Sequence, residues 1–88
     1  MIKLTIDDEV YWAKPAKVRD WLRLEKDCET DNEFNLSVMA LCVVDKDDKP
    51  VFSQEDLLDM AMPRWKRVNR AVTRANRSEE DEKEQEKN

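Results

Sequence analysis

Carboxylates are the most numerous side chains that could do chemistry in this chain. Aspartate and glutamate account for 21 of the 88 residues, whereas histidine and glycine are absent. Without histidine the chain lacks the usual general base and zinc ligand, and without glycine it lacks a phosphate-cradling loop. Close acidic pairs arise by chance at this density, and no apolar setting singles out one carboxylate for a raised pKa. We therefore assign no catalytic, cofactor-binding or metal-binding residue and expect a protein that is not an enzyme.

Two smaller groups could take part in metal or thiol chemistry. Cys28 and Cys42 are too few for a structural zinc site, which needs about four ligands. They could pair, but with no signal peptide before them we expect reduced thiols, with Cys42 in a helix core. The run Asp45-Lys46-Asp47-Asp48 begins like a calcium loop but lacks the glycine and glutamate that such a loop requires further on. A solvated turn accounts for these charges.

Basic residues are concentrated near the C-terminal end. Residues 63–77 carry six positive and no negative side chains, in a chain of net charge −5. Five of them are spaced three or four apart and predict an arginine row on one side of a helix: Arg64, Arg67, Arg70, Arg74 and Arg77. A solvated face and a docking surface both fit this row. For docking, protein carboxylates are favoured over nucleic acid, because the chain is acidic overall and the one aromatic residue among the arginines, Trp65, is expected on the other face of the helix.

The apolar pattern predicts a mainly helical α+β fold, with a small bundle of three to four helices in a single domain at residues 1–77. Alternation at Ile2, Leu4 and Ile6, followed by Val10-Tyr11-Trp12, predicts a β-hairpin within residues 1–14. A helix is expected from about Ala16 to Cys28, with an inward stripe of Val18, Trp21, Leu22 and Leu24. Residues 78–88 have no apolar side chain and are expected to form a disordered charged tail.

A second set of helices should follow. The central helix is predicted from Phe34 to Val44, with Asp31 or Asn32 as N-cap, and it is apolar nearly all round, so protein must surround it. Ser53 and Asp56 form a near capping box for a helix that continues to Met62. Pro63 stops or kinks that helix. A last helix from about Arg64 to Arg77 should turn Trp65, Val68, Ala71, Val72 and Ala75 toward the core.

Apolar side chains outnumber the places that so small a core offers. A chain of this length buries only about 60% of its unfolded surface. Four apolar residues around the Pro63 break are the candidate docking patch, joined by three arginines as candidate partner-binding residues: Leu58, Met60, Met62, Trp65, Arg67, Arg70 and Arg74. The alternative for the four apolar residues is that they simply close the core.

The stretch from Trp21 to Asn76 also resembles a known family. A helix ending in Val43-Val44-Asp45, an acidic turn, Pro50-Val51-Phe52 and then Ser53-Gln54-Glu55-Asp56-Leu57 is similar to the tail assembly chaperones of long-tailed bacteriophages. Many members carry glycine in the turn, where this chain has Asp48 or Lys49. Aspartate tolerates the left-handed backbone conformation better than most residues, so the departure is compatible with the resemblance.

The resemblance implies a function in phage tail assembly. The protein would bind the tape-measure protein, keep it soluble and help recruit tail-tube subunits in the cytoplasm of the bacterial host, then leave before the virion is complete. No cofactor is implied, association into a homo-oligomer remains open, and no apolar run approaches the ~20 residues that span a membrane. Two other functions remain open: a small DNA-associated regulator that uses the arginine row, and a structural head–tail or tail component of the virion.

Overall fold

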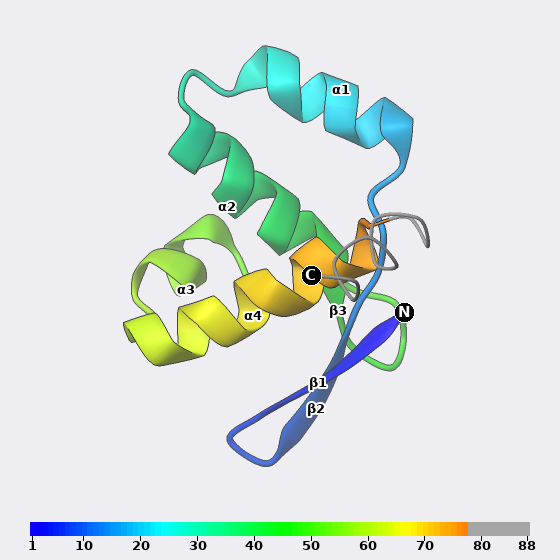
Figure 1. Ribbon diagram of the computed structural model, residues 1–88, viewed down its shortest axis with the longest axis vertical. Helices are drawn as coiled ribbons and strands as arrows, with labels where there is room; N and C mark the ends of the chain where they lie inside the picture. The colour runs from blue at the N-terminus through cyan, green and yellow to red at the C-terminus, as the bar shows by residue number, and fades with distance from the viewer. Residues whose placement is uncertain (78–88) are drawn as a thin grey trace, which may run out of the picture.

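The computed structural model describes residues 1–77, and the expected charged tail at 78–88 lies outside the described residues. Within the described part, the elements follow in the order β1 (Ile2–Ile6), β2 (Glu9–Ala13), α1 (Val18–Asp27), α2 (Asp31–Cys42), β3 (Val43–Val44), α3 (Gln54–Leu58) and α4 (Met62–Ala75). The sheet lies at one end and α1 at the other, with α2, α3 and α4 between them (Figure 1). The small, mainly helical α+β fold with an N-terminal hairpin is confirmed.

The hairpin of β1 and β2 closes with a tight loop of two aspartates. Ile6 pairs with Glu9, so only Asp7 and Asp8 connect the antiparallel strands. Both have positive φ, at 50° and 67°, as the two-residue loop that matches strand twist requires. Glycine is the usual residue at such positions. A chain without glycine uses aspartate there instead, because its short polar side chain tolerates this conformation.

The end of the predicted central helix forms a strand instead. Helix α2 stops at Cys42, and Val43 and Val44 pair with Ala13 and Trp12 of β2. β-branched valine fits a strand better than a helix, so the predicted helix end at Val44 was wrong by two residues. The predicted N-cap was also wrong, because the hydroxyl of Thr30 caps α2 by accepting the backbone N–H of Glu33 at 3.1 Å.

Asp45 organises the turn after β3. Its Oδ1 accepts the backbone N–H groups of Asp47 at 2.8 Å and Lys49 at 3.1 Å. These bonds, from Lys49 first and then Asp47, hold the pKa of the Asp45 carboxyl below its usual value. Asp48 has a φ of 62°, so an aspartate occupies the left-handed position of the turn. The Asp45 carboxylate is thus used in hydrogen bonds within the turn, and residues 1–77 contain no cluster of three side chains that could bind a metal.

The capping box at the start of α3 is confirmed. The hydroxyl of Ser53 accepts the N–H of Asp56 at 3.1 Å, and the Asp56 carboxylate accepts the N–H of Ser53 at 2.9 Å. These bonds lower the pKa of Asp56. The helix is shorter than predicted, because α3 ends at Leu58 rather than at Met62. Helix α4 then begins at Met62 with Pro63 in its first turn, where a missing N–H costs nothing.

The core lies between α2, α4 and the inner face of the hairpin. Helix α2 packs against α1, α3, α4 and β3, which makes it the central helix, as predicted. The core-facing stripe of α4 is confirmed, since Val68, Ala71 and Val72 are buried. The buried cluster consists of Leu4, Ile6, Tyr11, Ala13, Val38, Met39, Cys42, Val43, Leu57, Val68, Ala71 and Val72.

Burial raises the pKa of the Cys42 thiol, and both cysteines are free.

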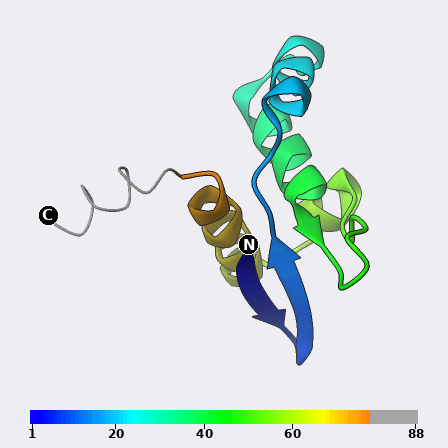
Figure 2. The same cartoon turned by 90° about the vertical axis from the view of Figure 1, so that its right-hand side faces the viewer.

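Helix α1 lies outside this core, at the end of the molecule opposite the hairpin (Figure 2). None of its residues is buried. Val18 and Leu22 are 74% and 57% exposed, so their predicted inward position was wrong. The helix is anchored by Leu24 and by Trp21, whose ring meets the Phe34 ring edge-on at 4.7 Å between centroids. A turn of about 100° per residue places Val18 and Leu22 well away from the side of Leu24.

Candidate docking groove

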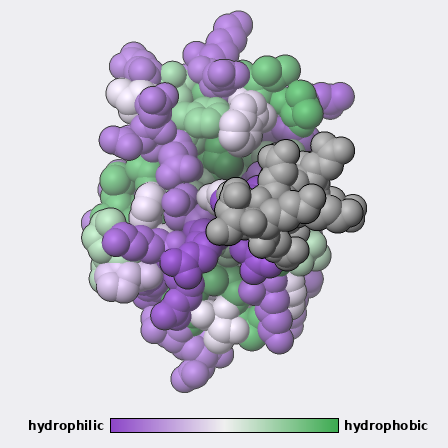
Figure 3. All heavy atoms as spheres, viewed as in Figure 1, coloured by the Kyte–Doolittle hydropathy of each residue, from purple (hydrophilic) through white to green (hydrophobic). Residues whose placement is uncertain are grey.

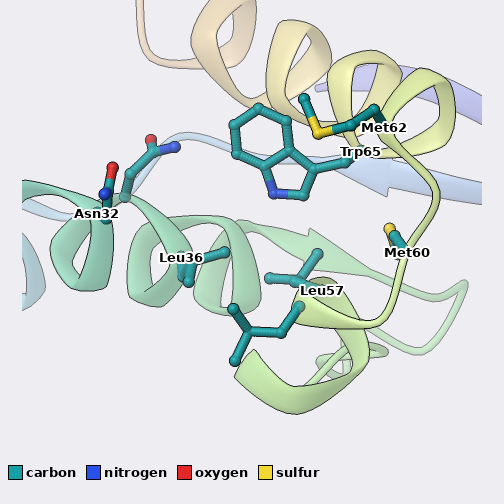
Figure 4. Close-up of a pocket in the computed structure, with 8 residues that line it drawn as sticks. Asn32, Leu36, Leu57, Met60, Met62 and Trp65 are labelled. Carbon is teal, nitrogen blue, oxygen red and sulfur yellow. The ribbon is translucent and has the colours of Figure 1, made fainter.

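The four apolar residues of the predicted patch lie around a single hollow. Leu58, Met60, Met62 and Trp65 line a space of about 290 Å³ between α2, α3 and the start of α4. Figure 4 shows the Trp65 ring reaching from α4 toward Leu36 on α2, with Leu57 and Met60 on the α3 side. We call this hollow the docking groove.

The chain reversal between α3 and α4 builds the groove. The N–H of Met60 donates to the carbonyl of Leu57 at 3.3 Å as α3 ends, and the N–H of Trp65 donates to the carbonyl of Ala61 at 3.0 Å as α4 begins. Because Pro63 has a fixed φ and needs no N–H partner, it suits the first turn of the new helix. Apolar residues at the end of one helix and the start of the next therefore open onto the same hollow.

Exposure separates the residues that close the core from those that are available to a partner. Leu57 is only 1% exposed, whereas Leu58 and Met62 are 59% and 58% exposed. Met60 and Trp65 are half-buried against the core cluster. The alternative that all four patch residues close the core therefore fails for Leu58 and Met62. On the face shown in Figure 3, apolar side chains appear in separate groups within a largely hydrophilic surface.

One wall of the groove comes from α2 and was missed by the sequence reasoning. Asn32, Asn35 and Leu36 line the groove. Their spacing of three and four residues places them on one side of a helix, and this is the signal that could have found them. Asn35 also connects the wall to α4, because its amide donates to the side-chain oxygen of Asn69 at 3.4 Å.

The arginine row is shorter than predicted. Arg67, Arg70 and Arg74 are exposed on α4, whereas Val68, Ala71 and Val72 of the same helix are buried. Among the described residues none of the three forms an ion pair or hydrogen bond. Including Arg64 in this exposed row was wrong.

Arg64 instead turns toward the hairpin. It is half-buried, and its guanidinium pairs with the Asp7 carboxylate at 3.0 Å. Arg77, at the other end of the row, is also half-buried. The docking groove is lined by Met62 and Trp65 of α4 but by none of the three exposed arginines.

Comparison of the chain with known protein families, with curated proteins and with solved structures finds no match in any of the three. In the part of the chain that the structure describes, every helix is too short or too polar to cross a membrane. Functional inference therefore depends on the docking groove and the charges around it.

Proposed function

We propose that this chain binds an apolar helical segment of another protein in the docking groove, and that it is a tail assembly chaperone whose client is the tape-measure protein. The observation that supports this proposal is the exposure of Leu58 and Met62, which line the same groove as the more buried side chains of Leu57 and Trp65. A single-domain surface with such an apolar hollow is typical of a partner-binding site.

The groove suits a helix better than an extended peptide. It is bounded by helices α2 and α4 and by the end of α3, and an amphipathic helix buries its apolar side in such a groove. Two of the lining residues are methionines, whose flexible side chains adapt to irregular apolar partners. Covering a leucine or methionine side chain completely contributes about 1.5–3 kcal/mol, so Leu58 and Met62 could supply a moderate affinity.

In tail assembly this binding would keep the long client soluble. The net charge of −5 gives the complex a repulsive exterior that opposes aggregation. Many copies along one client would gain from multivalency even when each contact is weak. The chaperone would help recruit tail-tube subunits in the host cytoplasm and would be absent from the mature virion. This function requires no catalytic residue and no cofactor.

Co-expression with the tape-measure protein tests the proposal with a matched pair of variants. Leu58→Asp places a charge at the groove edge, whereas Leu22→Asp places the same charge on α1 at a leucine of nearly equal exposure, 57% against 59%. We expect the wild-type chain and Leu22→Asp to keep the client in the soluble fraction and Leu58→Asp to lose this ability, with unchanged circular dichroism in both variants. Full client solubility with Leu58→Asp would rule out the groove as the client site.

A DNA-associated regulator is the alternative favoured by three exposed arginines that have no ion pair or hydrogen bond within residues 1–77, namely Arg67, Arg70 and Arg74. Phosphate-driven binding is strongest at low salt, so a gel shift at low salt that disappears at moderate salt and in the triple Arg→Gln variant would favour it. The third alternative, a structural component of the virion, predicts that the protein is present in purified particles.

A further inference from the structure

A second hollow adjoins the docking groove and differs from it in chemistry. It has a volume of about 430 Å³ and is lined by Tyr11, Phe52, Asp56, Asp59 and Arg64, among others. Met60 lines both hollows, so they are neighbours along the α3–α4 connection. We call the second hollow the acidic pocket, because two aspartates and only one basic residue line it.

Most charged groups of the acidic pocket are already paired. Arg64 is matched by Asp7, and the carboxylate of Asp56 accepts the N–H of Ser53 in the capping box. The phenol of Tyr11 donates to the Glu9 carboxylate, a bond that, together with burial, raises the pKa of Tyr11. Among the described residues, the side chain of Asp59 has neither an ion pair nor a hydrogen bond. The pocket therefore has an excess of negative charge and one available carboxylate.

Two aromatic residues also line the acidic pocket. The rings of Tyr11 and Phe52 meet edge-on with centroids 5.4 Å apart. Long basic side chains place their methylene groups on apolar surface while the charged end reaches a polar partner. Arginine additionally stacks on aromatic rings and pairs with carboxylates through two N–H groups. A pocket lined by an aromatic pair and by an aspartate without a partner among residues 1–77 thus fits an arginine side chain.

We propose that the helical segment bound in the docking groove carries a basic residue, preferably arginine, one turn away from its apolar residues, and that this residue enters the acidic pocket and pairs with Asp59. This inference rests on the proposed function of the groove. Residues three or four apart on a helix are neighbours on its surface, and the two hollows are also neighbours, because Met60 lines both. The acidic pocket then sets the direction and register of the bound helix.

Synthetic peptides provide the probe. An alanine-based helical peptide carries two leucines one turn apart and an arginine one turn further on, and matched peptides carry glutamine or glutamate in place of the arginine. Binding to the full chain is followed by calorimetry at low salt. A partly exposed ion pair contributes up to about 1 kcal/mol, so the arginine peptide should bind about two- to fivefold more tightly than the glutamine peptide. The glutamate peptide should bind most weakly, and the preference should shrink as salt is added.

Variants of the chain assign the preference to one carboxylate. Asp59→Asn should bind the arginine and glutamine peptides equally, and Asp59→Arg should prefer the glutamate peptide. Asp47→Asn removes the same charge from the turn after β3, away from the acidic pocket, and should retain the wild-type preference for arginine. This control separates pairing with Asp59 from general attraction of a basic peptide to an acidic protein.

The two proposals fail in different ways. Peptide binding that Leu58→Asp leaves unchanged contradicts the proposed function of the groove. A different result overturns only the assignment of Asp59. In that case Leu58→Asp abolishes peptide binding, but the wild-type chain binds the arginine and glutamine peptides equally tightly. An arginine preference that survives in Asp59→Asn also overturns that assignment.

Discussion

The side-chain oxygen of Asn76 accepts a hydrogen bond from the backbone N–H of Ala16 at 2.8 Å, across 60 positions of the sequence. The amide nitrogen of the same side chain donates to the carbonyl of Val72 at 2.9 Å and approaches Cys42 Sγ at 3.8 Å. One side chain therefore ties the end of α4 to the segment that leads into α1 and to the end of α2. This side chain therefore connects three segments that are far apart in the sequence.

Asn76→Ala should lower the free energy of unfolding by about 1–2 kcal/mol, because the N–H of Ala16 loses its partner and two further contacts disappear. Asn76→Asp keeps an oxygen for Ala16 and loses only the donor, so its effect should be smaller. Urea denaturation followed by tryptophan fluorescence measures both variants. Equal stability of Asn76→Ala and the wild-type chain would contradict the structural role of this side chain.

Two leucines of α1 should respond differently to truncation. Leu24→Ala removes one of the two anchors of α1 and should cost roughly 1–2 kcal/mol, less than truncation of a fully buried leucine. Leu22→Ala removes a side chain that is 57% exposed and should change stability by less than about 0.5 kcal/mol. Thermal unfolding of the two variants side by side tests this. A larger loss of stability in Leu22→Ala than in Leu24→Ala would indicate that Leu22 faces inward, as the sequence predicted.

Asp8→Gly should stabilise the protein by roughly 0.5–1 kcal/mol. Asp8 has a φ of 67°, and glycine adopts this conformation without the steric cost that a Cβ atom brings. Part of the gain is offset by the larger conformational entropy of glycine in the unfolded chain. The melting temperature measures the difference. Asp47→Gly, at a turn residue whose φ is not positive, is the control and should bring no gain.

The turn after β3 should contribute to the loss of stability in acid. The pKa of Asp45 is lowered in the folded state by the N–H groups of Lys49 and Asp47, so the folded state binds its proton less readily than the unfolded chain does. The resulting stability is present above the unfolded pKa of about 4 and is lost as the pH falls through the lower folded value.

Asp45→Asn separates this contribution from those of the other carboxylates. The amide still offers an oxygen to the two N–H groups but carries no charge, so the variant should be less stable than the wild-type chain at pH 7 and equally stable well below pH 4. Urea midpoints across this pH range measure the difference. A difference that stays constant with pH would contradict the role of the charge, and Asp47→Asn controls for the loss of one negative charge from the same turn.

Local patterns predicted the elements whose cause lies within a few residues. The alternation of Ile2, Leu4 and Ile6 indicated the hairpin, and Ser53 with Asp56 indicated the start of α3. The helical spacing of Val68, Ala71 and Val72 indicated the buried side of α4. These predictions succeeded because strand alternation, capping and helix periodicity are set by short-range geometry.

The misplaced residues depended on partners that are distant in the sequence. Val43 and Val44 could extend an apolar helix, and they form a strand because β2 offers them an edge. Arg64 fitted the row of arginines, yet Asp7 of the hairpin draws it to another side of α4. Val18 and Leu22 were expected to face inward, but α1 meets the rest of the molecule mainly through α2.

By itself the sequence determined the α+β class and the cluster of apolar residues around Pro63. It also determined that the chain has no histidine to act as a general base or zinc ligand and no glycine for a phosphate-binding loop. Only the tertiary structure decided that these residues form the rim and floor of a groove with α2. It also decided that Asp59, which has no partner in the described part of the chain, lines the same pocket as Tyr11 and Phe52. The physical reason is that composition and periodicity fix which side of an element is apolar. Which other element covers that side, and how completely, depends on contacts between residues far apart in the chain.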